Sequence, residues 1–180
     1  SAPFGEALRL LTKARPEMRV VVPAARSVAE EVLAQTADWP GAPIVIDPRA
    51  GTPETAAARK RAAFKAANVS LAASGTVSLE LAAAATPMVI AYRMQWLSYR
   101  IIRTMALIDT VTLVNIVSDT RVVPEFLGPA CQPAPISRAL EHVLAHPQEQ
   151  IAAMALTMDR LGQGGEAPGM RAARAVLERM

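Results

Sequence analysis

The feature that most constrains this chain is the alternation of short apolar runs with helical segments. The apolar runs occupy residues 18–22, 43–46, 69–72, 88–91 and 111–114, and helical periodicity occupies residues 3–13, 26–35, 54–67, 77–85 and 95–108. Strands that alternate with helices build parallel sheets, so the pattern predicts an α/β fold with a Rossmann-like parallel sheet flanked by helices. Because the runs are continuously apolar, we expect strands that are buried on both faces.

The second part of the chain has a different character. It contains three mainly helical stretches at 121–127, 136–144 and 148–161, then a Gly-rich turn at 162–165 and a last helix at 170–180. We expect residues 1–162 to form one domain with extra C-terminal helices, and residues 163–180 to pack towards another domain. No strand precedes the opening helix, although one would complete the sheet, and this favours a chain that was cut just upstream.

Composition excludes several classes of protein. The longest uncharged stretch, 66–79, contains Ser and Gly and falls short of the roughly 18 residues of a membrane span, and no secretory signal opens the chain. We therefore expect a cytoplasmic protein. The lone Cys131, with only His142 and His146 beside it, predicts neither a disulfide nor a structural zinc site. A net charge of +3 favours an anionic partner, but an aromatic content of 4% argues against nucleic acid.

Residues 71–80 form the most informative segment. An apolar strand ends in Ser74, Gly75 and Thr76 and leads directly into an Ala-rich helix. Backbone N–H groups at such a corner can bind phosphate, and a glycine allows close approach of an oxyanion. A helix cap supplied by Ser74 or Thr76 explains the same residues equally well.

Two further positions could face the same crevice. Glu80 lies about one helical turn beyond Thr76 and could accept hydrogen bonds from ribose hydroxyls, or it could be a solvated helix carboxylate. Tyr92 and Arg93 follow the apolar run at 88–91. Arg93 could neutralise a diphosphate while Tyr92 packs on a sugar or base, or Arg93 could begin the next helix and pair with a carboxylate.

The helix expected at 95–108 carries aromatic and basic residues on one face, at Trp96, Tyr99, Arg100 and Arg103. This face suits anionic lipid headgroups, and it suits a second domain or subunit equally well.

The last group of candidates lies beyond this helix. Asn115 follows an apolar run, where it either stabilises a turn or presents its amide to a ligand. Pro124 is compatible with a first helical turn or a kink in the stretch 121–127, and Glu125 would then lie near the amino end of that helix.

These motifs together resemble the carboxyl-terminal half of lipid-A-disaccharide synthases. The matching residues are Ala-Ser-Gly-Thr-Val-Ser-Leu-Glu at 73–80, Pro-Met-Val-Ile-Ala-Tyr-Arg-Met at 87–94, Asn115, and Val-Pro-Glu-Phe-Leu at 123–127. Four motifs in this order make the resemblance specific, and it extends over nearly the whole chain, including the closing Gly-rich turn and helix. The resemblance implies a GT-B glycosyltransferase, in which two Rossmann-like domains face each other and the second binds the donor nucleotide.

The resemblance also implies an activity. Such enzymes transfer 2,3-diacylglucosamine from UDP to the 6-hydroxyl of 2,3-diacylglucosamine 1-phosphate, which forms a β-1′,6 linkage and releases UDP. Carried onto this chain, UDP would contact Ser74, Gly75 and Thr76, with Glu80 towards the ribose and Asn115 towards the diphosphate or donor sugar. The general base is expected in the absent amino-terminal domain, so we assign no catalytic residue here.

Three departures from the family pattern are visible. Val114 stands where Pro usually precedes the Asn, Gly128 stands where Gln often follows the Pro-Glu-Phe-Leu run, and the Gly-Ser-Arg element expected before the first helix is absent.

The remaining expectations concern cofactors and partners. Without an Asp-x-Asp pair to hold a divalent cation, we expect no cofactor and no metal dependence. We expect a UDP-linked lipid sugar as ligand, the absent amino-terminal domain as partner and a location peripheral to the inner membrane; a homo-oligomer is compatible with the sequence. The chain alone should bind UDP weakly without turnover. The alternatives are another UDP-sugar GT-B enzyme, or a stand-alone module that binds UDP or a lipid headgroup.

Overall fold

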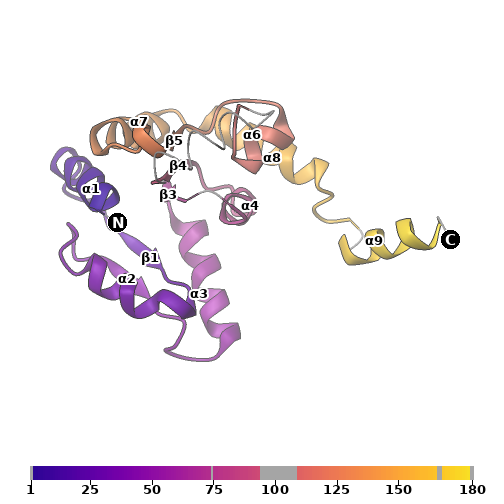
Figure 1. The fold of residues 1–180 in the computed structure, drawn as a ribbon, viewed down its shortest axis with the longest axis horizontal. Coiled ribbons are helices and arrows are strands. Elements are labelled where there is room, and N and C mark those ends of the chain that lie inside the picture. The colour runs from indigo at the N-terminus through magenta and orange to yellow at the C-terminus, as the bar shows by residue number, and fades with distance from the viewer. Residues whose placement is uncertain (1, 74, 94–108, 166–167, 179–180) are drawn as a thin grey trace.

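The structure, a computed structural model, describes residues 2–73, 75–93, 109–165 and 168–178 (Figure 1). All paired strands are parallel and form two sheets, one of two strands in the order β1-β2 and one of three in the order β3-β4-β5. The strands are β1 (Val21–Pro23), β2 (Ile44–Ile46), β3 (Ser70–Ala72), β4 (Met88–Tyr92) and β5 (Glu125–Leu127). Helices pack on both faces, which confirms the predicted α/β fold with parallel strands.

Most of the predicted helices are present within a few residues of their expected bounds, and the helix expected at 95–108 lies outside the described residues. The helices are α1 (Ala2–Ala14), α2 (Ala29–Thr36), α3 (Pro53–Ala66), α4 (Val77–Ala83), α6 (Leu113–Ser118), α7 (Pro133–Ala145), α8 (Gln148–Arg160) and α9 (Pro168–Leu177). Short 3₁₀ turns occupy Arg26–Val28 and Gly128–Ala130. Figure 1 shows α9 extending away from the body of the molecule, at the end opposite α1.

Strand β4 is the centre of the fold, and its alternate residues enter two different cores. Val89 and Ala91 join a cluster with residues of α1 and α7, whereas Met88 and Ile90 join a second cluster with residues of α3, α4, α6 and α8. All four of these side chains are fully buried. The expectation of burial on both faces is therefore confirmed for β4.

The same expectation is wrong for the first two strands. Val21 of β1 is 42% exposed and Ile44 of β2 is 59% exposed. The physical reason is their position: these strands form a two-stranded sheet, so little structure surrounds them compared with β4.

Between Val111 and Leu127 the structure has a helix where a strand was expected, and a strand where a helix was expected. The strand expected at 111–114 is wrong, since helix α6 starts at Leu113 and ends where Asp119 adopts a left-handed conformation with φ of 58°. The helix expected at 121–127 is also wrong, since β5 forms there and pairs with β4. Pro124 is accommodated just before this strand, where its carbonyl accepts a hydrogen bond of 2.9 Å from the amide of Ile90. Pairing with a buried central strand outweighs the helical pattern of so short a segment.

Within the described ranges, no helix has both the length and the apolar character needed to cross a membrane.

Candidate functional site

The expected ligand-binding turn and the residues Tyr92 and Arg93 lie at the ends of neighbouring strands. Strand β3 pairs with β4 in parallel, with Ala72 opposite Ile90. The turn follows β3, and Tyr92 and Arg93 end and follow β4. The carboxyl ends of parallel strands share one edge of the sheet, and this edge is where open α/β sheets bind ligands. The structure therefore brings these two groups of predicted residues to the same edge.

The turn after β3 is open to solvent. Gly75 has φ of 124°, and a Cβ added there would meet nothing within 4 Å. Thr76 occupies the N-cap position of α4, yet its side chain makes no capping hydrogen bond. The turn is instead held by Ser78, whose hydroxyl donates to the carbonyl of Gly75 at 2.9 Å. The hydroxyl of Thr76 is thus exposed next to an unobstructed backbone, while Ser74 lies outside the described residues.

Glu80 forms an ion pair with a residue that sequence reasoning had not assigned to the site. The ammonium of Lys60, on α3, lies 2.7 Å and 2.8 Å from the two carboxylate oxygens of Glu80. It also lies 5.4 Å from the ring centroid of Phe64. Glu80 keeps 44% of its side chain exposed. The carboxylate is therefore held in place by Lys60 and can still accept hydrogen bonds. The basic run at 59–61 marks this region in the sequence, but the run alone does not show which of its three residues pairs with Glu80.

Arg93 borders a hollow of about 370 Å³ at the same edge of the sheet. Its other lining residues come from the start of α1, the segment after β5 and the start of α7: Pro3, Gly128, Pro129, Cys131, Gln132 and Pro133. Tyr92 is 46% exposed. No described carboxylate forms an ion pair with Arg93, so the expected alternative of a paired arginine is not seen among these residues.

Cys131 lines this hollow and is itself buried. Burial raises the pKa of the Cys131 thiol, and the nearby Arg93 guanidinium acts in the opposite direction as the smaller effect. The thiol is therefore neutral at physiological pH.

Asn115 is buried inside α6 and engaged within the protein. Its side-chain oxygen accepts from the amide of Val123 at 3.0 Å, and its side-chain nitrogen donates to the Val123 carbonyl at 3.0 Å and to the Thr110 hydroxyl at 3.2 Å. Only 1% of Asn115 is exposed. Of the two sequence-based alternatives for Asn115, the structure shows the stabilising contact; contact with a ligand stays a prediction.

Glu125 belongs to the same network, although the sequence pattern placed it on a helix at 121–127 and the structure has it on strand β5. From β5 its carboxylate accepts from the amide of Thr112 at 2.8 Å, from the amide of Val111 at 3.2 Å and from the hydroxyl of Thr110. It therefore satisfies the backbone at the start of α6, where a negative charge is favoured. The expectation that Glu125 lies near the amino end of a helix at 121–127 is wrong, since β5 forms there; its carboxylate instead binds the start of α6.

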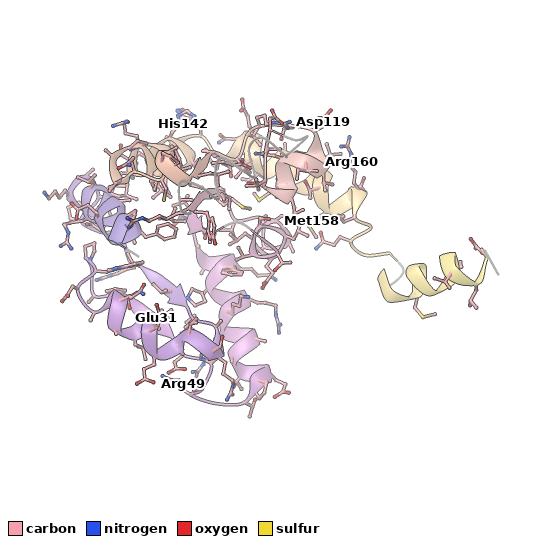
Figure 2. All side chains as sticks on the ribbon, in the orientation of Figure 1. Glu31, Arg49, Asp119, His142, Met158 and Arg160 are labelled. Carbon is pink, nitrogen blue, oxygen red and sulfur yellow. The ribbon has the colours of Figure 1, made fainter. Side chains whose placement is uncertain are left out.

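Other charged groups cluster away from this edge. Figure 2 labels Glu31 and Arg49 in the part of the molecule formed by α2 and the loop after β2, and Asp119 and Arg160 at the α6–α8 end. Arg49 binds Asp47 at 2.8 Å, which lowers the pKa of the Asp47 carboxyl.

Two further predictions stay open. Trp96, Tyr99, Arg100 and Arg103 lie outside the described residues. In the ranges that the structure covers, no three His, Cys, Asp or Glu side chains gather as they would around a metal ion.

Comparison with known proteins shows which family the chain matches. A sequence model of the family described as lipid-A-disaccharide synthetase matches residues 2–177. Three proteins named lipid-A-disaccharide synthase are similar to the chain: 62% identical over 177 residues in Ruegeria pomeroyi, 41% over 182 residues in Paramagnetospirillum magneticum, and 40% over 177 residues in Rhodospirillum centenum. The alignments cover 97–98% of this chain but only 42–44% of each relative, so the chain spans less than half the length of these relatives.

Proposed function

Since the chain belongs to the lipid-A-disaccharide synthetase family, we propose that it binds the nucleotide-sugar donor of a glycosyltransferase that forms the lipid A disaccharide. The donor is UDP-2,3-diacylglucosamine, the acceptor is 2,3-diacylglucosamine 1-phosphate, and UDP leaves as the β-1′,6 bond forms. The observation that carries this proposal is the open turn at Gly75 and Thr76 beside Arg93, at the ends of two neighbouring parallel strands.

The chemical task of this site is to stabilise the negative charge that grows on the diphosphate as the sugar leaves. Arg93 supplies a permanent positive charge at the edge of the sheet. The backbone of Gly75 can approach a phosphate oxygen closely, since no side chain fills the space above it. The Thr76 hydroxyl can donate to a second oxygen. Donors fixed before the charge develops lower the barrier without having to reorganise.

The ribose would lie towards Glu80. Two neighbouring ribose hydroxyls can donate to one carboxylate, and Lys60 holds that carboxylate in a single position. In this arrangement Lys60 positions Glu80 and need not touch the ligand. Asn115 and Glu125 would support the site indirectly, because their hydrogen bonds hold residues 110–112 and 123 in place.

The reaction as a whole needs groups beyond these residues. The chain spans less than half the length of its relatives, and the general base is expected on the facing domain. We therefore expect these 180 residues to bind UDP weakly and to turn nothing over. Backbone N–H groups and Arg93 together can stabilise the diphosphate without a cation, so UDP binding should be the same in EDTA as in magnesium.

We also propose that the chain associates with an anionic membrane surface or with a second subunit. This proposal rests on the aromatic and basic face expected at Trp96, Tyr99, Arg100 and Arg103. Sedimentation with phosphatidylglycerol vesicles tests it, since Arg100→Glu with Arg103→Glu should release the chain from the vesicles if these arginines bind the lipid.

The experiment that tests donor binding is calorimetry with UDP on two glycine variants. Gly75→Ala places a methyl group where a phosphate would approach, and we expect UDP affinity to fall about tenfold or more, the loss of roughly 1.4 kcal/mol. Gly164→Ala is the matched control, because Gly164 also has a positive φ, of 82°, and open space around its Cβ. Both variants place an alanine at a positive φ, but only one lies at the proposed site.

The control decides how the result is interpreted. Equal UDP affinity in wild type and Gly75→Ala would overturn the proposed position of the diphosphate. A loss of affinity that is as large in Gly164→Ala would show that backbone strain, not blocked access, causes the change. No heat with UDP at all, in a chain whose circular dichroism shows a folded protein, would overturn donor binding itself.

A further inference from the structure

Two histidines lie at the carboxyl end of helix α7, in contact with solvent. His142 is in the last turn of α7, His146 is the residue that ends the helix, and both are exposed. The amide of His146 donates to the carbonyl of His142 at 2.9 Å, so helical hydrogen bonding extends to His146. Residues four positions apart on a helix lie one above the other. The two imidazoles are therefore neighbours, and Figure 2 labels His142 at the outer edge of the molecule.

The distance between the two rings suits a shared metal ion. Their centroids lie 5.1 Å apart, and the ring planes are tilted by 52°. A metal bonds to an imidazole nitrogen at about 2.0–2.1 Å, and that nitrogen lies about 1.2 Å from the centre of its ring. Two imidazoles that bind one ion near the tetrahedral angle therefore have centroids roughly 5 Å apart. The pair already has this separation, so rotation of the side chains can direct two nitrogens at one ion without movement of the backbone.

Both imidazoles are free to bind an ion. In the ranges that the structure describes, each ring contacts the other, and neither forms a side-chain hydrogen bond or an ion pair. A neutral imidazole has one nitrogen with an unshared electron pair, and this nitrogen is the commonest metal ligand in proteins. An ion that binds the pair therefore displaces only water and breaks no contact within the protein.

The type of ligand selects the class of metal. No carboxylate or thiol joins the pair within the described part of the chain, where no three His, Cys, Asp or Glu side chains gather around a common point. Mg²⁺ and Ca²⁺ need oxygen ligands, whereas imidazole suits Zn²⁺, Cu²⁺ and Ni²⁺. Two protein ligands leave the remaining coordination positions to water. This distinguishes the pair from a structural zinc site, which has four protein ligands.

We propose that His142 and His146 form a bidentate site for a divalent transition-metal ion of the Zn²⁺ and Ni²⁺ class. The bound ion links the last turn of α7 to the residue that ends it, and so stabilises this end of the helix. The hollow lined by Cys131, Gln132 and Pro133 lies at the other end of α7, about 20 Å away along the helix. The site does not depend on the proposed function, and its ion takes no part in binding UDP.

Calorimetry with Ni²⁺ on the 180-residue chain, without UDP, tests this site. We expect the unaltered chain to bind Ni²⁺ through the pair. The matched variant combines His142→Ala with Ala134→His, at an exposed position of α7. It keeps two histidines but separates them by about 18 Å along the helix. We expect its affinity for Ni²⁺ to be about tenfold lower or less, because the two rings can no longer bind one ion together.

The separated pair also controls for other metal ligands. Cys131 and the amino terminus are unchanged in this variant, so metal bound there cannot produce the difference. His146→Ala should lose as much affinity, and Ni²⁺ should raise the melting temperature of the unaltered chain but of neither variant. Mg²⁺ at the same concentration should not displace Ni²⁺.

Three results would overturn the site. The first is equal Ni²⁺ affinity in the unaltered chain and in either variant. The second is no heat from the unaltered chain at millimolar Ni²⁺, in a protein whose circular dichroism shows that it is folded. The third is displacement of Ni²⁺ by an equal concentration of Mg²⁺, because that would exclude an imidazole ligand set.

Discussion

Glu125 shows how one carboxylate can hold the start of a helix in another part of the chain. In Glu125→Ala the amides of Val111 and Thr112 and the hydroxyl of Thr110 lose their shared acceptor. We expect the free energy of unfolding in urea to fall by about 1–3 kcal/mol, the cost of leaving such groups unpaired. Glu125→Gln keeps one acceptor oxygen and should lose less.

Glu17→Ala is the control for this prediction. Glu17 is exposed in the turn between α1 and β1, so its loss should change stability by no more than about 0.5 kcal/mol. A Glu125→Ala protein as stable as Glu17→Ala would show that the carboxylate does not stabilise α6.

The Cys131 thiol should react slowly with iodoacetamide. Burial raises its pKa, so the reactive thiolate is rarer than in a free cysteine at the same pH. Alkylation rates measured against pH should give a midpoint above that of free cysteine, and Arg93→Ala should move it higher, because the guanidinium lowers this pKa. A midpoint at or below that of free cysteine would contradict the burial of the thiol.

The raised pKa of the Cys131 thiol also makes the stability of the protein depend on pH. The neutral thiol is favoured in the folded state, so its contribution is fully present below the pKa of the unfolded thiol. That contribution is lost as the pH rises through the folded-state pKa.

At this scale the sequence predicted candidate residues but not the contacts that they make. Gly75, Thr76 and Arg93 were found because a strand end beside a helix start is a local pattern. The roles of Asn115, Glu125 and Lys60 depend on partners up to 20 positions away, such as Glu80 for Lys60. No local pattern contains such pairs, because tertiary packing creates them.

Among the elements, strand β4 depends on a side chain of helix α8. Gln150 is 2% exposed, accepts from the amide of Met88 at 2.8 Å, and donates to the carbonyls of Met88 and Val122 at 3.0 Å and 3.1 Å. Gln150→Leu leaves these backbone groups buried and unpaired. We expect a loss of about 3 kcal/mol in the free energy of unfolding, measured by urea denaturation.

Gln148→Leu, at the exposed start of the same helix, is the matched variant. It makes the same chemical change without touching β4 and should be nearly neutral. If both variants lose equal stability, the loss comes from a change in helix α8 and not from the hydrogen bonds between Gln150 and β4.

The elements that sequence reasoning found share a strong signal. Helices α1, α3, α7 and α8 are long enough for their apolar periodicity to show. Helix α6 and strand β5 have six and three residues, and over such lengths the two periodicities cannot be told apart. Residue composition then misleads, because Val-rich segments favour strands in isolation, while Glu125–Leu127 becomes a strand only beside β4.

For the molecule as a whole, helix α9 should contribute little to stability. Its residues Met170, Val176 and Leu177 are 60%, 61% and 70% exposed. A chain that stops after Gly165 should melt within about 2 °C of the full chain, because these three apolar side chains are mostly exposed and their loss removes little buried surface. Scanning calorimetry measures this. A clearly lower melting temperature would show that α9 packs on the body.

A chain that stops after Ala145 provides the contrast. It also loses α8, whose Met154 is fully buried and whose Gln150 completes β4, and it should not fold cooperatively.

At this scale the sequence predicted the fold class, the order of most elements and the edge of the sheet that carries the candidate site. It could not show that β1 and β2 would form a sheet of their own, because strand pairing joins residues far apart in the chain. Exposure of Val21 and Ile44 follows from that pairing and not from their apolar character.

The packing of α1 against α7 also dictates when the protein can become stable during its synthesis. Leu11 is translated well before Leu140 and Val143, which belong to the core that buries it. Until α7 has been translated, the nascent chain carries an apolar helix with nothing to cover it, and such surface recruits chaperones or aggregates. Premature termination anywhere ahead of α7 therefore leaves α1 without the helix that covers its apolar face.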